Sequence, residues 1–444
     1  MKIPKLPLGF AFLCATLSTF PLAVQAAPGD LDTTFGTGGI VATDAPTDVT
    51  DIALQSDGKI VSAGGVSGNF SVSRYNTNGT LDTSFGSGGT VLTDFGGGSS
   101  DKAFGVVIQS NGKILVAGYS NAPGVTSFAV ARYNSNGTLD TTFSGDGLAT
   151  TQIGTTSSIA YDLALQSDGK IVVVGTSNNN FAILRYNSNG TLDTSFSGDG
   201  IDVRDAGRNG QDIAKGVAIQ SDGKIVVGGD DALFSGSTYT QRFVLMRYNT
   251  NGTLDTGFSG DGIQTTNFGP GVSGNPIKDG LNGIAIQSDG KIVAAGFTKP
   301  GTTVAGSTVQ SIAIARYTTS GALDTSFSSD GLVETVFPSG QSQASDVAIQ
   351  SNGKIVVVGY NQDAGSTYSA VARYNTNGSL DTSFSGDGLA RTALNTSLSY
   401  GYANSVAIQS DGKIVGGAST YLVRYIGDTI AAIAPATAPS GNAS

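Results

Sequence analysis

Few of the side chains that usually carry enzyme chemistry occur in this sequence. It contains no His and no Trp, one Cys, Cys14, and one Glu, Glu334. Imidazole catalysis and zinc sites built from Cys and His are therefore excluded, and thiol chemistry could involve Cys14 alone. An enzyme would have to use Asp, Tyr or Arg, and no two Asp residues stand out as a hydrolytic carboxylate pair. The composition favours a non-catalytic protein, with a lyase or hydrolase, Ca²⁺-dependent or not, as the alternative.

An oxygen-rich turn recurs along the chain and could bind Ca²⁺. In one copy, Asn134, Asn136 and Asp140 occupy the first, third and seventh positions of a tight loop, which partly matches the ligand spacing of calcium loops. Two of these groups are neutral amides, and Asn-x-Asn-Gly is also an ordinary turn sequence. We expect no cofactor, with Ca²⁺ as the one candidate.

The charge of the chain limits its partners. Acidic residues outnumber basic residues, and the formal net charge is −10. Nucleic acid and anionic membrane surfaces repel such a protein, so we expect neither as a partner. A protein or a glycan is the expected partner of what we expect to be a monomer.

Both ends of the chain differ from the middle. Lys2 and Lys5 precede an apolar run from position 6 to 24, and small residues occupy positions 24 and 26, so we expect residues 1–26 to be a signal peptide. The mature protein would be secreted, periplasmic or at the cell surface, without membrane insertion after cleavage. Residues 427–444 are rich in Ala and Pro and lack the repeat, which predicts a disordered tail.

Between these ends one module of about 55–65 residues recurs seven times. Apolar runs flank each copy of Gln-Ser-(Asp/Asn)-Gly-Lys-Ile, and Asp-Gly or Asn-Gly between such runs predicts a hairpin whose two turn residues have positive φ. An Arg-Tyr strand follows, and then Leu-Asp-Thr-x-Phe leads into a fourth strand. The copies of the hairpin sequence begin at Gln55, Gln109, Gln166, Gln220, Gln287, Gln350 and Gln409.

The phase of the repeat at the chain ends distinguishes a ring from an open stack. The mature chain begins with a fourth strand, at residues 31–43, and the last module stops after its third strand, at Tyr425. A fourth strand from the N-terminus can therefore complete the last module, which leaves no unpaired edge. The sequence predicts an all-β fold: a seven-bladed β-propeller over residues 27–426, built from four-stranded antiparallel blades.

The segments QSDGKIVVVG, FAVARYN, NGTLDTSF and SGDG, in that cyclic order, resemble the delta-60 repeat family of bacterial secreted and surface proteins. The resemblance covers roughly residues 30–425. It implies a propeller-like fold and an exported protein. It implies no established reaction and no catalytic residues.

Residues that all copies share are expected to be scaffold. Each Arg of the Arg-Tyr pair lies in a strand, and in six copies an Asp follows eight residues later, as in Arg185 and Asp193. We expect each repeated Arg to form ion pairs or to donate hydrogen bonds to backbone carbonyls.

Residues that one copy has alone are better candidates for function. The connections between strands two and three and between consecutive modules should emerge on one face, and they vary in length. Long insertions at 230–242, 267–282 and 298–311 belong to adjacent modules, and binding residues often collect on such loops. The alternative is that they are neutral, solvated insertions. The candidate ligand-binding residues are Asp230, Asp231, Phe234, Tyr239, Arg242, Lys278, Asp279 and Lys299.

Overall fold

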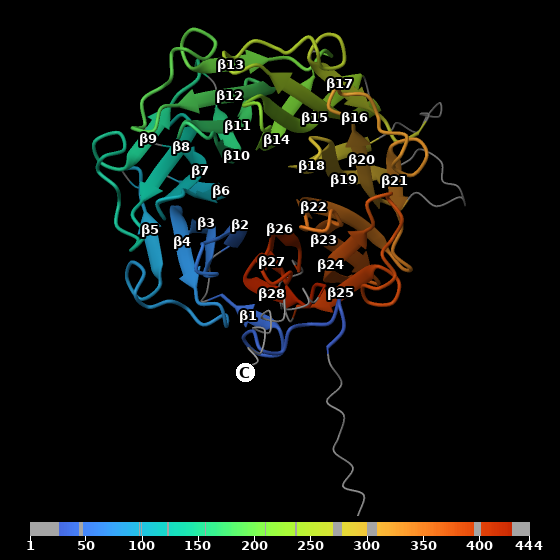
Figure 1. Cartoon of the computed structure of the whole chain (residues 1–444). Helices are drawn as coiled ribbons and strands as arrows, with labels where there is room; N and C mark the ends of the chain where they lie inside the picture. The colour runs from blue at the N-terminus through green and yellow to red at the C-terminus, as the bar shows by residue number, and fades with distance from the viewer. Residues whose placement is uncertain are drawn as a thin grey trace, which may run out of the picture.

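The structure, a computed structural model, describes residues 26–43 and 48–428, apart from 97, 99, 122–123, 156, 209, 236–237, 270–277, 300–308 and 395–400. The predicted signal peptide and tail lie outside the described residues, except for residues 26, 427 and 428. The regular structure of the described part consists of β-strands. Figure 1 shows the strands grouped in sheets around a common axis.

Five of the sheets contain four strands each and follow the predicted module order. One sheet contains β2 (Asp48–Leu54), β3 (Ile60–Val66), β4 (Asn69–Tyr75) and β5 (Thr90–Thr93). The next two contain β6 (Asp101–Ile108), β7 (Ile114–Ser120), β8 (Ser127–Tyr133) and β9 (Leu148–Thr151), and β10 (Ser158–Leu165), β11 (Ile171–Ser177), β12 (Asn180–Tyr186) and β13 (Ile201–Arg204). The others contain β22 (Gln341–Ile349), β23 (Ile355–Asp363), β24 (Ser366–Tyr374) and β25 (Leu389–Ala393), and β26 (Ala403–Ile408), β27 (Ile414–Ala418), β28 (Tyr421–Tyr425) and β1 (Ile40–Ala42).

A sixth sheet contains eight strands. Its first half comprises β14 (Gln211–Ile219), β15 (Ile225–Ser235), β16 (Thr238–Tyr248) and β17 (Ile263–Thr266). Its second half comprises β18 (Lys278–Ile286), β19 (Ile292–Lys299), β20 (Ser311–Tyr317) and β21 (Leu332–Thr335). One parallel pair, Gln241 with Lys278, joins the halves, whereas all pairing within each half is antiparallel.

The N-terminal strand pairs with the C-terminal one. Residues 40–42 of β1 run antiparallel to β28, with Ile40 opposite Val423. The backbone N–H of Asp32 donates to the carbonyl of Arg424 (2.8 Å), and the Arg424 Nε lies 2.8 Å from Asp32 Oδ2. The two ends of the described chain are therefore held to the same sheet.

The first strand of each four-stranded unit, here called the inner strand, carries a β-bulge. In β6, for example, the register shifts between Ala103 and Gly105, and an extra residue at a bulge turns nearby side chains out of the regular alternation. The facing residue of β7 is Gly118, where a Cβ would lie 2.0 Å from the carbonyl oxygen of Lys102. Glycine is required there because the bulged backbone occupies that space.

The repeated hairpin differs in one respect from the sequence prediction. In Gln-Ser-Asp-Gly-Lys, only the Gly has positive φ, as at Gly58 (81°). The N–H of Gln55 donates to the carbonyl of Lys59, and Asp57 Oδ1 accepts from the N–H of Lys59 (3.1 Å). The turn is therefore a three-residue loop whose Asp side chain closes it, and the prediction of two residues with positive φ was wrong.

The predicted role of the repeated Arg residues is confirmed. Each of six pairs with the Asp eight residues later, at Nε to Oδ2 distances of 2.6–2.8 Å, and Arg424 pairs with Asp32. Arg185 also donates to the carbonyl of Thr250 in the next sheet, and its guanidinium lies 4.8 Å from the centre of the Phe196 ring. These clamps fix each third strand to its own fourth-strand segment and to its neighbour.

Candidate functional site

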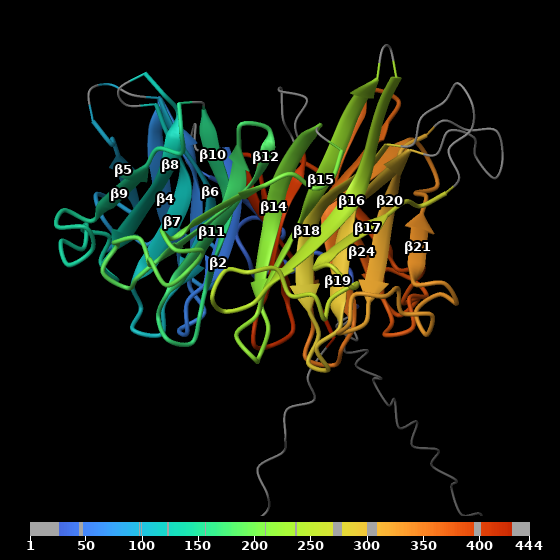
Figure 2. The ribbon, with the colours of Figure 1, turned by 90° about the horizontal axis from the view of Figure 1, so that it is seen from above.

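The insertion at 230–242, expected to be a loop, is mostly a β-hairpin. β15 and β16 extend eleven residues each and pair as far as Ser235 and Thr238. Figure 2 shows these two strands as long arrows that extend toward one side of the molecule. Of the other two insertions, residues 278–282 begin β18 and residues 298–299 end β19, whereas 270–277 and 300–308 lie outside the described residues.

Three of the candidate binding residues are buried and have protein partners. Asp230 (2% exposed) accepts from Lys215 Nζ (2.6 Å), Gln241 Nε2 (2.7 Å) and the N–H of Leu281 (2.7 Å). Asp231 pairs with Arg242 and Arg208, and Asp279 accepts from Thr298 Oγ1 and the N–H of Phe268. Burial raises the pKa of Asp279 to about 6. These groups hold the hairpin to the neighbouring strands, and their contact with a ligand stays a prediction.

The other candidates lie nearer the surface. Phe234 is 65% exposed and its ring centre lies 4.7 Å from that of Tyr239, whose face Lys278 Nζ approaches to 5.2 Å. Lys299 is exposed and lies opposite Lys278 in the register of β18 and β19. The structure thus brings Phe234, Tyr239 and Lys278 together.

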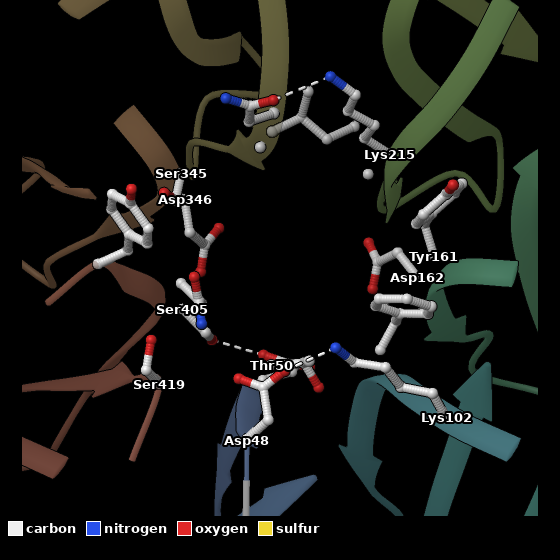
Figure 3. Close-up of a pocket in the computed structure, with 18 of the residues that line it drawn as sticks. Asp48, Thr50, Lys102, Tyr161, Asp162, Lys215, Ser345, Asp346, Ser405 and Ser419 are labelled. Carbon is white, nitrogen blue, oxygen red and sulfur yellow. Dashed lines mark hydrogen bonds and ion pairs between the residues drawn. The ribbon is translucent and has the colours of Figure 1, made fainter. Parts of the chain in front are cut away.

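Sequence reasoning missed a concave site, a cavity of about 820 Å³ at the axis around which the sheets are arranged (Figure 1). Its wall includes residues of the inner strand of every unit. The turn between β27 and β28 contributes Ser419 and Thr420, and β28 contributes its first residue, Tyr421. That turn belongs to the variable connections, so the cavity, here called the channel site, opens toward the variable face. Figure 3 shows polar and aromatic side chains surrounding its centre, with Asp162 and Asp346 on opposite walls.

Three carboxylates occupy equivalent bulge positions in the wall, on β2, β10 and β22. Asp51 accepts from the N–H of Val106 on the next inner strand (2.7 Å), and Asp162 and Asp346 accept in the same way from Val217 (2.8 Å) and Val406 (2.9 Å). Each also accepts from the N–H of the residue that follows it in its own strand. The carboxylates therefore connect successive inner strands.

Burial disfavours the charged form of all three carboxylates. It raises the pKa of Asp51 to about 6, although Ser405 and two backbone N–H groups donate to that side chain. Burial and the negative charge of Asp51 raise the pKa of Asp346 to about 7. Burial, Asp51 and Asp346 raise the pKa of Asp162 well above its usual range.

Aromatic side chains cover another part of the wall. The ring centres of Phe104 and Tyr161, from β6 and β10, lie 5.3 Å apart, and Lys102 Nζ lies 5.4 Å from the centre of the Phe104 ring. Tyr402 directly precedes β26, and its ring centre lies 4.7 Å from that of Tyr360. An aromatic wall with a few fixed polar groups is typical of small-molecule sites.

A signal for the channel site was present in the sequence. The position four residues before each repeated Gln lies in an inner strand. In the seven copies this position is occupied by Asp51, Gly105, Asp162, Gly216, Gly283, Asp346 and Ser405. The small residues make room for the carboxylates, since a Cβ on Gly105 would lie 3.2 Å from the Cα of Asp162 and one on Gly283 would lie 2.9 Å from Asp346 Oδ1. A comparison of this position among the seven copies would have separated the three Asp residues from the residues that all copies share.

The turn proposed for Ca²⁺ is held by its own hydrogen bonds. Asn136 Oδ1 accepts from the N–H and the hydroxyl of Thr138, and Asn134 Nδ2 donates to the same hydroxyl (3.0 Å). Within the described residues there is no group of three or more acidic side chains placed to hold a metal ion. Ca²⁺ binding stays a prediction.

For the Ca²⁺ hypothesis we expect a chelator to leave the melting temperature unchanged, because these turn oxygens already accept protein donors. Thermal unfolding followed by circular dichroism, with and without EDTA, measures this. A fall of several degrees that added Ca²⁺ reverses would contradict the expectation and establish a structural calcium site.

Comparisons with known proteins agree with the fold. The family model described as domain of unknown function (DUF5122) β-propeller matches residues 55–85, 109–143, 166–196, 220–258, 287–327 and 350–384. The chain therefore contains repeats of a β-propeller repeat family. A search of curated protein sequences gave no match. Within the described residues, no helix has the length and apolar character needed to cross a membrane.

Solved structures with the same fold have very different sequences. A catalytically inactive variant of virginiamycin B lyase from Staphylococcus aureus, with quinupristin, is 12% identical and has a TM-score of 0.51, over 87% of this chain and 98% of that chain. An ulvan lyase bound to a saccharide is 12% identical, with a TM-score of 0.48 over 88% and 96% of the two chains. The WD40 β-propeller domain of Doa1 is 14% identical, with a TM-score of 0.48 over 88% and 98%. Likeness at these identities shows the fold alone.

Proposed function

We propose that this protein is an exported, non-catalytic β-propeller of the delta-60 repeat type that binds a glycan at its variable face, with the channel site at the centre. The carrying observation is the asymmetry of the two faces. All seven turns on one face have the same hydrogen bonds, from the N–H of Gln to the carbonyl of Lys, whereas the connections on the other face differ in length and composition. A rigid scaffold with one variable face is suited to recognition.

For the architecture we infer seven blades in a closed ring. The eight-stranded sheet counts as two blades, because a single parallel pair joins its halves. The N-terminal β1 counts as the fourth strand of the blade formed by β26, β27 and β28. Contacts between β26 and β2, the last and first inner strands, support closure: Ser405 Oγ donates to Asp51, and Asn404 Nδ2 donates to the carbonyl of Val49 (2.7 Å).

The chemistry of the wall favours a glycan over a protein partner. A pyranose presents an apolar C–H face that packs on an aromatic ring, and hydroxyl groups that donate to carboxylates. Phe104 and Tyr161 offer the rings, and Asp162 and Asp346 offer the acceptors, all in a cavity rather than on a flat surface. A protein partner would instead use the exposed Phe234 at the tip of the long hairpin.

The test separates these two surfaces. We expect Phe104→Ala to weaken binding about tenfold to the best glycan found in an array, because a stacked ring contributes about 0.5–1.5 kcal/mol. Phe234→Ala, a matched loss of one ring outside the channel, should leave that affinity unchanged. Isothermal titration calorimetry gives both constants. Binding that depends on Phe234 and not on Phe104 would refute a channel site, and no glycan binding by the wild type would refute the proposal.

One observation favours the enzymatic alternative. The pKa of Asp51 is raised to about 6 and that of Asp346 to about 7, which would suit general acid catalysis near neutral pH. Against this, both oxygens of each carboxylate accept backbone N–H donors, which assigns them a structural task. Turnover of a polysaccharide by the wild type, lost in Asp346→Asn, would establish a lyase or hydrolase instead.

A further inference from the structure

The charges in the wall of the channel site do not balance. Its two lysines each have an acidic partner: Lys102 Nζ lies 2.6 Å from Asp48 Oδ2, and Lys215 Nζ lies 2.6 Å from Asp230 Oδ2. The three bulge carboxylates have none. Among the described residues, no Lys or Arg pairs with Asp51, Asp162 or Asp346, and their donors are backbone N–H groups and the hydroxyl of Ser405.

The repeated clamps do not share this imbalance, because every Asp there faces an Arg, as Asp193 faces Arg185 at 2.7 Å. Asp279 also accepts only from neutral donors among the described residues, but it does not line the channel site. Partly buried carboxylates without a cation are costly, because neutral donors compensate only part of the lost hydration. A bound cation would supply the missing charge at this site.

The shape of the wall indicates what kind of cation fits. The carboxylates come from three inner strands spread around the axis, and the described residues bring no three acidic groups close enough for one metal ion. A larger ligand that spans the cavity could reach more than one of them. The face of Phe104 already lies 5.4 Å from an ammonium group, that of Lys102, so this wall accepts organic cations beside its rings.

The contacts between neighbouring inner strands also single out the aromatic part of the wall. Side chains bridge most junctions with hydrogen bonds, as Thr50 Oγ1 does to the carbonyl of Ala103 (2.9 Å) and Asn282 Nδ2 does to that of Ala344 (2.7 Å). Between β6 and β10 the corresponding residues are Phe104 and Tyr161, which meet ring to ring. Asp162 follows Tyr161 directly, so a carboxylate and two rings lie at one junction.

We propose that the channel site selects glycans that carry a protonated amine, with the amine near Asp162 or Asp346 and the sugar ring against Phe104 and Tyr161. The inference rests on the proposed function and adds the class of glycan that is bound. The ammonium group donates to carboxylate oxygens, which retain lone pairs beside their backbone donors. The apolar face of the sugar and the adjacent positive charge both favour an aromatic ring.

The protonation of the wall is consistent with this selection. Burial and mutual repulsion raise the pKa of Asp346 and Asp162, so an unliganded channel reduces its charge by taking up protons. A cation favours the ionised carboxylates and reverses that uptake. The affinity for an amine that stays charged, such as spermidine, should therefore rise as the pH rises from about 5 to 8.

The decisive experiment compares two ligands with the same sugar backbone, one with protonated amines and the other with neutral acetamido groups in their place. The tetramer of glucosamine and the tetramer of N-acetylglucosamine are titrated into the wild-type protein at about pH 6 by calorimetry. We expect the amine form to bind at least about tenfold more tightly. Equal affinities, or preference for the acetylated form, would overturn the amine inference and leave the glycan-binding function standing. Binding of neither tetramer would overturn the inference, while the array described above decides on the function separately.

Variants locate the effect. Asp162→Asn and Asp346→Asn should each reduce the preference for the amine form by about threefold to tenfold, with little change for the acetylated form. Asp57→Asn, on the face with the seven identical turns, removes the same charge from a side chain that is 57% exposed. It should leave the preference for the amine form unchanged. A preference retained in both channel variants, each verified as folded by circular dichroism, would refute the location. The wild-type comparison of ligands tests the inference even if one variant fails to fold.

Discussion

Replacing Arg185 with Met is expected to lower the free energy of unfolding by about 3 kcal/mol, because it leaves buried Asp193 with the partly exposed Lys170 (3.1 Å) in place of two cations. The guanidinium is 3% exposed, pairs with Asp193 at 2.7 Å, donates to Ser195 Oγ (3.1 Å) and packs on Phe196. It also donates to a carbonyl in the next sheet, so the loss weakens a junction as well as one strand. Urea unfolding followed by circular dichroism measures the change.

A matched control is available in the same sheet. Arg204 pairs with Asp202 at 3.1 Å, but its side chain is 38% exposed. Arg204→Met should therefore cost at most about 1 kcal/mol. The double variant Arg185→Met with Asp193→Leu should be less destabilised than the two single changes add up to, since neither charge is then stranded. Equal costs for Arg185→Met and Arg204→Met would contradict the clamp.

These clamps could be predicted because the same Arg and Asp residues recur at the same spacing in several copies of the module. Six copies place Asp eight residues after Arg, and the seventh, Arg424, has no such Asp ahead of it. The phase of the repeat supplies Asp32 from the other end of the chain, and the structure pairs it with Arg424 at 2.8 Å. Internal comparison therefore predicted the local Arg–Asp pairs and the pairing of the two chain ends, and the Arg424–Asp32 contact is where the two coincide.

The long hairpin was not predictable in the same way. The insertion was interpreted as a loop because it lengthens a connection that varies among the copies, and adjacent Asp residues such as Asp230 and Asp231 are unfavourable in strands. Their charges are neutralised by Lys215, Arg208 and Arg242, and two of these three lie outside the hairpin. Which cations reach a carboxylate depends on tertiary packing, and hydropathy does not encode it.

The channel site was missed because it depends on the bulges. In a regular strand the side chains of Asp346 and Val347 would lie on opposite faces of the sheet, and the sequence pattern placed Asp346 within the apolar run before Gln350 without a role of its own. The register shift between Ala344 and Asp346 changes that alternation and places the carboxylate in the wall of the channel. The bulge in turn requires Gly359 on the facing strand, where a Cβ would lie 1.9 Å from the carbonyl oxygen of Gln343.

The free energy of unfolding is expected to be greatest near pH 4 to 5 and to fall on both sides. On the acid side, the clamps are responsible: burial alone would raise the pKa of Asp193, but Ser195, Lys170 and Arg185 hold it well below its usual range. A carboxyl with a lowered pKa stabilises the folded state above its unfolded pKa, and this stability is lost as the pH falls through the folded value. Equilibrium unfolding in urea at a series of pH values gives the profile.

On the alkaline side the channel carboxylates act with the opposite sign. With pKa values raised to about 6 for Asp51 and about 7 for Asp346, they contribute stability that is fully present below the unfolded pKa, near 4, and is lost as the pH rises through 6 and 7. We expect a loss on the order of 2 kcal/mol between about pH 5 and 8. Asp346→Asn cannot ionise, so it should make this limb less steep and leave the acid limb unchanged, whatever its own cost at a fixed pH. Asp51 and Asp279, whose pKa values are raised to about 6, should account for part of the slope that remains. A wild type that is more stable at pH 8 than at pH 5 would show that the channel carboxylates are ionised in the folded protein without penalty. That result would also remove the physical reason for a cation in the channel.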